Sequence, residues 1–452
     1  MRPIHTLSVL AFTLAALSTS ACDQHASADA KPIPAVSSRP PPRISASASP
    51  STVPAASSAA SAQPPKREPM NVIMLVVDAW RDDMPWAGYP RDVVPNLHKL
   101  WKKSVRWERG YSAASFTSKC VPVLLSGRYA SSLERTTPFF TRYRESNEMM
   151  AEVLQKAGVR TLGVQAHMYL KEASGLQQGF DVWRMVPNIE WDYNKDPYIT
   201  GPDHTKLNIE VLSQAENTGK QFFGYFHYMD PHDIYNPHPE APDWGKKGRD
   251  HYDQELWFAD MWIQKMLDFI ETQPWAKNTA IVVTGDHGEG FGEHSFYKHA
   301  FEVYEMLVRV PLFVYVPGVQ PRLIDRWRSH IDLAPTVYDL MGVKAPEGLP
   351  GTSLAPEIFG ETQGQRPILC DLPADSLNVR HRALIDEEGY KLVAFGQDVK
   401  YELYNVREDP GEKRDLFKQE RARAEAMVAR YKKISAATPF VKAEGGKPVK
   451  RD

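Results

Sequence analysis

The sequence predicts an α/β protein, a three-layer α/β/α sandwich around a largely parallel central sheet, followed by a smaller C-terminal α+β subdomain. Three observations favour this fold. Nearly continuous apolar runs of strand length recur along the chain, polar residues follow most of them, and amphipathic helical stripes lie between them. Such an alternation is typical of a parallel sheet that helices cover on both faces.

The apolar runs, taken in order, bring acidic residues and histidines to the ends of strands. Residues 71–77 form the first run, which stops at Asp78. Four similar runs span 161–165 before His167, 222–228 before Asp230 and His232, 279–284 before Asp286 and His287, and 310–316. Because ligands of open α/β sheets bind beyond the carboxyl ends of the strands, we expect these side chains to meet at one rim.

Helices are predicted between these runs. Apolar residues share one helical face in two stretches: Leu97, Leu100, Trp101 and Val105 in the first, and Leu256, Ala259, Ile263, Met266, Leu267 and Ile270 in the second. A further helix is predicted to begin around residues 118–121, because Pro122 is tolerated in a first turn and apolar residues follow it. Thr117 would then lie at the N-terminus of that helix.

The composition excludes several classes of protein. Of the 452 residues, 42% are hydrophobic and 24% are charged, values that argue against a wholly disordered chain or a coiled coil. The 54 basic and 56 acidic residues leave a net charge of −2, so we expect no nucleic-acid partner. Three cysteines are too few for a disulfide scaffold or a cysteine-based zinc site.

The first 69 residues indicate an export signal and a tether. Residues 1–22 combine Arg2, an apolar run too short to span a bilayer, and small residues before Cys22. This pattern resembles a bacterial lipobox, so we expect an exported cell-envelope lipoprotein, periplasmic or on the outer surface, that meets the membrane through its N-terminal lipid only. An ordinary cleaved signal peptide would instead give a secreted protein. Residues 23–69, rich in Ala, Ser and Pro, predict a disordered tether.

Four segments combine residue types that suit metal and anion binding: Asp78, 117–128 (TSKCVPVLLSGR), 227–235 (HYMDPHDIY) and 286–290 (DHGEG), which runs on to His299. Their order and spacing resemble the sulfatase branch of the alkaline phosphatase superfamily. The resemblance extends over most of residues 71–417 and includes Asp332-Leu333-Ala334-Pro335-Thr336 and Glu402-Leu403-Tyr404-Asn405. It implies the alkaline phosphatase-like fold and a metal-activated nucleophile that attacks a sulfur or phosphorus ester.

Two registers compete for the nucleophile. Typical sulfatases read Cys-x-Pro-x-Arg, and the cysteine, oxidised to formylglycine, stands ten residues before a glycine; counting back ten from Gly127 reaches Thr117, and Val121 takes the place of the arginine. Aligning Cys120 with the family cysteine fails, because Leu124 replaces the arginine and Gly127 follows after only seven residues. The threonine register resembles the phosphoethanolamine transferases and threonine-type sulfatase-like proteins. We therefore favour Thr117, with Ser118 as the second candidate.

The residues themselves support Thr117. At a helix N-terminus, free N–H groups and the helix dipole favour a tetrahedral anion, and Lys119 would add positive charge for substrate binding. A threonine hydroxyl needs its pKa lowered before it can attack, and a divalent cation does this. Taken alone, Thr117 fits a helix cap better than a nucleophile, and the metal-binding residue types elsewhere in the sequence favour the nucleophile.

The resemblance implies one divalent metal ion held by Asp78, Thr117, Asp286 and His287. One nitrogen among oxygens suits manganese or zinc, whereas an all-oxygen shell suits calcium or magnesium. Family members with an amide at the position of His287 tend toward calcium, so manganese, zinc and calcium stay open, as does a second metal. Each aspartate alone could instead satisfy loop N–H groups.

Three further histidines are assigned to catalysis and substrate binding. His299 lies thirteen residues after Asp286, the separation in the phosphoethanolamine transferases, and His232 falls at a substrate-side histidine of the same families. Both are expected to bind non-bridging oxygens, protonate the leaving group or hold a second metal. His167 follows a strand where sulfatases carry Gly-Lys-Trp-His, and it is assigned to substrate binding. His227 and His294 fit a structural role as well as a ligand role, and Glu289 and Glu293 are interpreted as loop anchors.

The leading hypothesis is an exported, metal-dependent hydrolase of sulfate or phosphate esters that uses Thr117 in place of formylglycine. Its substrate would be a small-molecule, glycan or lipid ester. A phosphoethanolamine-type transferase and a catalytically degenerate tethered binding protein are the alternatives. We assign residues 70–360 to the catalytic domain, 361–435 to a C-terminal subdomain packed on it, and 436–452 to a flexible tail.

Overall fold

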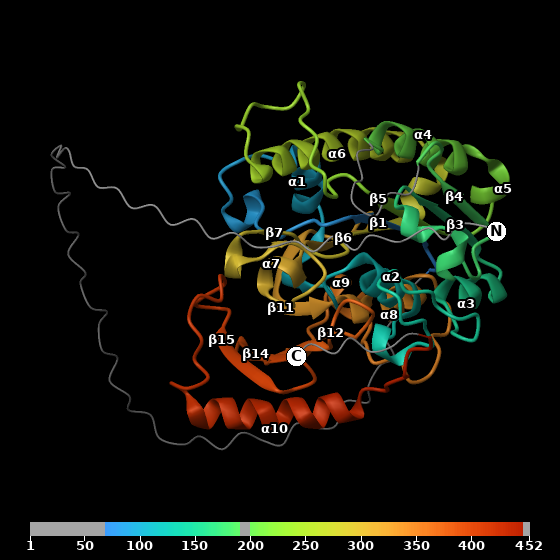
Figure 1. The fold of residues 1–452 in the computed structure, drawn as a ribbon. Helices are drawn as coiled ribbons and strands as arrows, with labels where there is room; N and C mark the ends of the chain where they lie inside the picture. Colours follow the sequence, from blue (N-terminus) through green and yellow to red (C-terminus); the bar gives the residue numbers. More distant parts are fainter. Residues whose placement is uncertain (1–67, 190–198, 446–452) are drawn as a thin grey trace, which may run out of the picture. The chain divides into compact units, whose positions relative to one another are not determined.

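A computed structural model describes residues 68–189 and 199–445 of the chain (Figure 1). The predicted export signal, Cys22 and nearly all of the tether lie outside the described residues, as does the end of the predicted tail. Among the described helices, none combines the length and apolar character that a membrane crossing requires.

The main sheet is largely parallel, as predicted. In the order β11-β2-β10-β6-β1-β5-β3-β4, only β10 runs opposite to its neighbours, and β9 adds an antiparallel pairing to β2. The strands are β1 (Asn71–Val77), β2 (Val105–Tyr111), β3 (Arg160–Gln165), β4 (Val182–Met185), β5 (Phe222–Tyr228), β6 (Thr279–Gly285), β9 (Arg309–Val310), β10 (Leu312–Tyr315) and β11 (Arg322–Ser329).

Helices cover both faces of this sheet (Figure 1), and every residue of the central strand β1 is therefore buried. Val72, Met74 and Val76 pack on one face with α2 (Thr117–Ser126), α3 (Met150–Lys156), α8 (Leu333–Leu340) and α9 (Ala355–Ile358). Ile73, Leu75 and Val77 pack on the other face with α1 (Pro95–Lys102), α4 (Gly201–Ser213) and α6 (Gly248–Glu271). The short helices α5 (Ala215–Thr218) and α7 (Glu305–Val308) complete this part. The alternation of side chains along a strand thus builds two cores and confirms the three-layer sandwich.

The C-terminal part is a small antiparallel sheet with one long helix, as the predicted α+β subdomain requires. Its strands, in spatial order, are β12 (Ile368–Leu372), β13 (His381–Ile385), β14 (Tyr390–Phe395) and β15 (Lys400–Asn405). One face, with Leu384, Leu392 and Leu403, packs on α10 (Arg421–Ala437). The other face, with Cys370 and Val393, shares a core with Trp327 of the main sheet.

Two predictions about single elements are wrong. Val105 was placed on a helical face with Leu97, but α1 ends at Lys102 and Val105 begins β2. The run 310–316 is not one parallel strand: it contains β9 and the antiparallel β10, which Pro311 separates, because proline has no N–H for the ladder.

Candidate active site

The site forms where β1 and β6 end side by side. These strands are parallel with Val77 opposite Gly285, so the next residues, Asp78 and Asp286, emerge together at the carboxyl edge of the sheet. The Asp286 N–H donates to the Val77 carbonyl at 3.2 Å, which continues the ladder by one residue. A side chain at Gly285 would come within 2.7 Å of the Trp80 carbonyl oxygen, so the close approach of the two loops requires glycine there.

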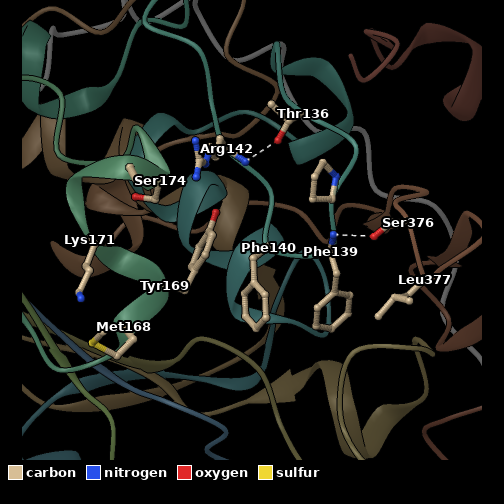
Figure 2. Close-up of a pocket in the computed structure, with 12 residues that line it drawn as sticks. Thr136, Phe139, Phe140, Arg142, Met168, Tyr169, Lys171, Ser174, Ser376 and Leu377 are labelled. Carbon is tan, nitrogen blue, oxygen red and sulfur yellow. Dashed lines mark hydrogen bonds between the residues drawn. The ribbon is translucent and has the colours of Figure 1, made fainter. Parts of the chain in front are cut away.

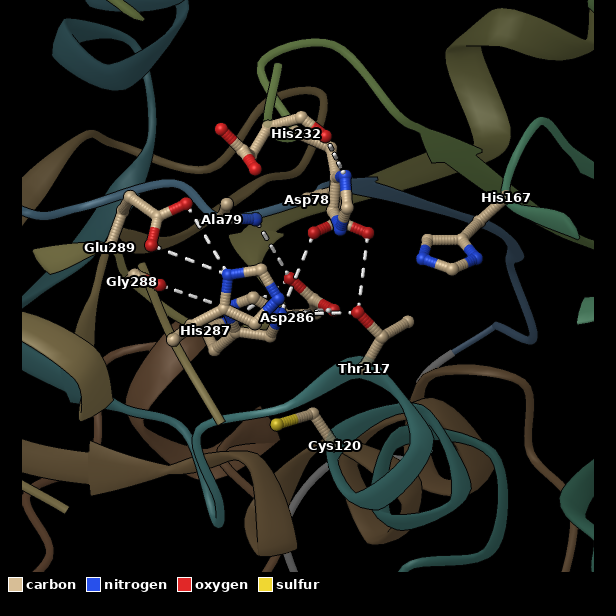
Figure 3. A network of polar contacts seen from close by, with 12 residues as sticks. Asp78, Ala79, Thr117, Cys120, His167, His232, Asp286, His287, Gly288 and Glu289 are labelled. Atoms are coloured by element: carbon tan, nitrogen blue, oxygen red, sulfur yellow. Dashed lines mark hydrogen bonds and ion pairs between the residues drawn. The ribbon is translucent and has the colours of Figure 1, made fainter. Parts of the chain in front are cut away.

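Thr117 enters this edge from the first turn of α2. The preceding residue, Phe116, is extended and caps the helix, so Thr117 is its first helical residue. The Thr117 hydroxyl lies 3.4 Å from Asp78 Oδ2 and 3.1 Å from His287 Nε2 (Figure 3). All of these side chains are fully buried. Thr117 thus faces the carboxylates from the first turn of α2, in which the Lys119 and Cys120 N–H groups donate to the Phe116 carbonyl.

The donors of Asp78, Asp286 and His287 fit a divalent cation. One ligand atom from each lies within 4.8 Å of the others, and His287 Nε2 is 3.5 Å from Asp78 Oδ1 and from Asp286 Oδ2. The other ring nitrogen of His287 lies 2.8 Å from the Gly288 carbonyl, so it carries the proton and leaves Nε2 as a lone-pair donor. Burial lowers the pKa of His287 well below its ordinary value and raises the pKa of Asp286 to about 7. A divalent cation would balance the charge of two buried carboxylates beside a neutral imidazole.

His227 is a residue of this group that the sequence left undecided. It lies near the end of β5, with Nε2 3.5 Å from Asp78 Oδ2 and 3.9 Å from Asp286 Oδ2. Burial, with His204 and His232 nearby, lowers its pKa to about 3, so it is neutral. Its Nε2 has no hydrogen-bond partner among residues 68–189 and 199–445. The pairing of β5 with β1 is the signal that could have found it, since Val76 and His227 are opposite each other.

Three further histidines lie in a row that begins beside His287, with the ring centroids of His287 and His299 4.4 Å apart. The ring centroids of His167 and His232 are 5.1 Å apart, and those of His232 and His299 are 5.2 Å apart. Burial and the neighbouring His299 lower the pKa of His232 to about 4, whereas burial and His232 lower that of His167 further below its ordinary value. The row brings the three predicted histidines to one place.

Glu289 holds His299 from behind. Both carboxylate oxygens lie 3.3 Å from His299 Nδ1, and the Glu289 side chain is fully buried. Burial lowers the pKa of His299, but the adjacent carboxylate outweighs this effect and leaves the pKa above its ordinary value. The interpretation of Glu289 as a loop anchor therefore missed its contact with a histidine ten residues later, which no local pattern indicates.

Lys119 and Cys120 lie on α2 but point away from this group. The Lys119 ammonium is fully buried, 3.5 Å from Asp375 and hydrogen bonded to Thr141. In this position it does not reach a substrate directly. The Cys120 thiol accepts a hydrogen bond from Ser112, and burial raises its pKa well above the ordinary value. A buried, protonated thiol is a poor nucleophile.

Comparison with known proteins agrees with this architecture. A family model described as "Sulfatase" matches residues 70–343, and one described as "N-sulphoglucosamine sulphohydrolase, C-terminal" matches residues 292–436. The chain is 26% identical over 190 residues to the Delta 4,5-hexuronate-2-O-sulfatase of Bacteroides thetaiotaomicron, and this alignment covers 40% of each protein. The chain thus spans about two fifths of the length of that curated relative.

Two solved structures share the fold at low identity. The crystal structure of Ps i-CgsB in complex with k-i-k-neocarrahexaose has a TM-score of 0.68 at 19% identity and covers 82% of this chain and 94% of its own. The phosphonate monoester hydrolase SpPMH from Silicibacter pomeroyi has a TM-score of 0.66 at 20% identity, over 82% of this chain and 96% of its own. Since the sulfatase model spans more than half of the sequence, the chain belongs to the sulfatase family.

Proposed function

We propose that this protein is an exported, metal-dependent hydrolase of sulfate or phosphate esters with Thr117 as its nucleophile. The observation that carries the proposal is the position of the Thr117 hydroxyl. It lies at the start of a helix, within 3.4 Å of a carboxylate oxygen of Asp78 and a ring nitrogen of His287. Membership of the sulfatase family and the fold shared with a phosphonate monoester hydrolase support the reaction class. The core that packs α2 against β1 gives the hydroxyl a rigid support.

The residues divide the work as follows. Thr117 Oγ1 gives up its proton to solvent and attacks the sulfur or phosphorus atom, and the bond from that atom to the leaving-group oxygen breaks. His299, held by Glu289 with its pKa above the ordinary value, donates a proton to that oxygen, while the neutral His232 and the N–H groups of Thr117 and Ser118 hold the equatorial oxygens. Water then attacks the threonine ester, releases sulfate or phosphate, and restores the hydroxyl. A divalent cation held by Asp78, Asp286 and His287 would lower the pKa of the Thr117 hydroxyl and balance the developing charge.

Phosphate esters are the favoured substrates within this proposal. A threonine ester has no second hydroxyl on its β-carbon, so it cannot expel sulfate by the elimination open to a formylglycine hydrate. Release must come from attack of water at the central atom, and His232 and His299 flank that place. An N-terminal lipid anchor at Cys22 remains part of the proposal.

The test is an assay of the protein after loading with manganese, zinc or calcium, on an aryl phosphodiester, an aryl phosphomonoester and an aryl sulfate. Thr117→Val keeps the shape of the side chain and removes the hydroxyl, so turnover should fall by at least about a thousandfold. Cys120→Ala is the matched control on the same helix and should keep its turnover. Mass spectrometry of the quenched enzyme should find the covalent adduct on the peptide with Thr117.

Two results would contradict the proposal. Loss of turnover in Cys120→Ala with full turnover in Thr117→Val would assign the nucleophile to the cysteine. Full metal occupancy with no turnover of any ester would exclude the hydrolase; turnover that appears only when an acceptor alcohol is added would instead identify a transferase.

A further inference from the structure

A cavity opens beside the row of His167, His232 and His299. Its lining differs from the group of Asp78, Thr117, Asp286 and His287. It has a volume of about 790 Å³, large enough for a drug-sized molecule. Seven of its side chains are apolar or aromatic: Pro138, Phe139, Phe140, Met168, Tyr169, Ala173 and Leu377 (Figure 2).

The cavity adjoins the place where the ester bond would break. Phe139 stacks on Phe116, the residue before Thr117, with ring centroids 4.0 Å apart, and Phe116 in turn lies 6.1 Å from His299. On the other side Tyr169, which lines the cavity, lies two residues after His167 and 6.3 Å from its ring. A group bonded to the reacting atom could therefore extend from the histidines into the cavity.

Polar atoms in the wall are engaged within the protein. The Tyr169 hydroxyl donates to the Thr141 carbonyl at 2.6 Å, and the Thr136 hydroxyl accepts from the Arg142 N–H at 2.9 Å. The Ser376 hydroxyl accepts from the Phe139 N–H at 2.9 Å. A sugar offers several hydroxyls that each need a partner, so this wall suits an apolar ring better than a glycan.

Among the lining residues whose side chains the structure describes, the charged ones carry one sign. They are Arg142 and Lys171, both exposed, and none of the described lining residues is acidic. Neither cation forms an ion pair with a carboxylate in the part of the chain that the structure describes, whereas the nearby Arg144 pairs with Glu444 at 2.6 Å. Arg142 also lines an adjoining hollow of about 400 Å³, so it borders both spaces. Figure 2 shows Arg142 and Lys171 to one side of the aromatic rings and Leu377 to the other.

We infer that this cavity binds the leaving group of the substrate, and that this group is an apolar ring bearing an anionic substituent such as a carboxylate. The inference rests on the proposed ester hydrolysis. The aromatic side chains hold the ring, and Arg142, with Lys171, binds the anion at the end remote from the ester. Lys119 contacts the cavity wall indirectly: its ammonium is hydrogen bonded to the Thr141 hydroxyl, and the Thr141 carbonyl accepts from Tyr169 of the wall.

Binding of the released alcohol tests the inference without turnover. Calorimetry on the full chain should find that para-hydroxybenzoate binds about tenfold tighter than para-hydroxybenzamide, which has the same shape and no charge. Arg142→Gln should abolish this preference. Lys156→Gln removes a cation from α3, outside the cavity and 69% exposed, and should leave the preference intact.

A second pair of variants tests the apolar wall. Leu377→Ala should weaken both ligands about threefold to tenfold, because its exposed side chain covers the ring. Leu323→Ala on β11 is the matched control: Leu323 is 55% exposed and Leu377 is 50% exposed, but only Leu377 lines the cavity. Equal binding of the two alcohols, tighter binding of N-acetylglucosamine than of either, or an unchanged preference in Arg142→Gln would overturn the inference.

Kinetics on the matching esters separate this inference from the proposed function. Lower KM for para-carboxyphenyl phosphate than for its carbamoyl analogue, lost in Arg142→Gln, would support both. The binding preference without turnover of either ester would support the cavity and refute the hydrolase. Turnover of both esters with equal KM would refute the cavity alone.

Discussion

At the scale of single residues, the charge of the proposed metal site of Asp78, Asp286 and His287 gives the sharpest prediction. Asp286 is buried beside a second carboxylate, so folding without a cation is costly. Removal of divalent ions should lower the melting temperature, and an ion at one hundred times its Kd should restore about 2.7 kcal/mol of stability. Asp286→Asn removes the unbalanced charge. This variant should melt at or above the metal-free parent and should not respond to added metal.

Asp260→Asn is the control for that experiment. Asp260 is also buried with a pKa raised by burial to about 7, but its oxygens accept from the Asn96 and Leu97 N–H groups at the start of α1. Loss of that cap should lower stability and leave the metal-induced shift unchanged. A metal response that survives Asp286→Asn would place the ion elsewhere.

Glu289 gives a second prediction at this scale, as a positioning residue. Glu289→Gln weakens the hold on His299 Nδ1, so kcat should fall about tenfold to a hundredfold with little change in KM. Glu293→Gln, which touches Arg81 and the Phe291 N–H instead, should be nearly neutral. If Glu289 acts through His299, the double variant with His299→Gln should be no slower than His299→Gln alone. Additive losses would refute the link.

The chemistry of single residues was only partly predictable from the sequence. The four proposed metal-site residues meet as expected because each follows a strand end or opens a helix. Lys119 was assigned to the substrate from its place near a helix N-terminus, but its side chain turns inward to Asp375, more than 250 residues away in the chain. A partner so distant in sequence leaves no trace in a local pattern. The contact of His299 with Glu289, ten residues before it, left none either.

At the scale of elements, strands buried on both faces were predictable and strands with charged residues were not. β1 and β5 have the predicted bounds because an unbroken apolar run fits only a central strand. β2 reads Val-Arg-Trp-Glu-Arg-Gly-Tyr, and its charges gave no such signal. In the fold, Arg109 pairs with Glu305 at 3.3 Å and Arg106 lies over the Trp101 ring. These partners come from other elements, so the sequence could not indicate that the charges are compensated.

The end of the helix that carries Thr117 depends on one glycine. Gly127 closes α2 in the left-handed region with φ of 69°, and a side chain there would lie 2.7 Å from Ala334 Cβ on α8. Gly127→Ala should therefore cost about 2–4 kcal/mol in urea unfolding, from backbone strain and from the displaced helix together. Gly88→Ala, with φ of 89° and no atom within 4 Å, isolates the strain and should cost about 1 kcal/mol. Equal losses of unfolding free energy in the two variants would mean that α8 moves away from a side chain at position 127 at no cost.

At the scale of the whole molecule, a buried ion group joins the C-terminal sheet to the main sheet. Lys391 of β14 is fully buried, 3.1 Å from Glu305 at the start of α7 and 3.0 Å from Glu412. Glu412 also accepts from the Glu305 N–H at 2.6 Å, and Arg109 of β2 pairs with Glu305. Four segments of the chain, which carry Arg109, Glu305, Lys391 and Glu412, thus meet at one point, and α7 follows the loop that carries His299. The stability of the C-terminal sheet is therefore coupled to the active-site rim.

This group predicts a pH-dependent effect of one substitution. Burial raises the pKa of Glu412 to about 7, above its unfolded value near 4.5, so the folded chain holds an extra proton between these values and loses stability as pH rises through them. At pH 5 Lys391→Met should be mild, because Glu412 is protonated and Glu305 keeps Arg109. At pH 8 it should cost about 3–5 kcal/mol in urea unfolding, because the Glu412 carboxylate is then buried without its cation. Lys400→Met on β15, 65% exposed beside Glu402, should cost less than about 1 kcal/mol at both values. A loss for Lys391→Met that is equal at pH 5 and pH 8 would show that Glu412 does not titrate in this range, and the ion group would then join the two sheets independently of pH.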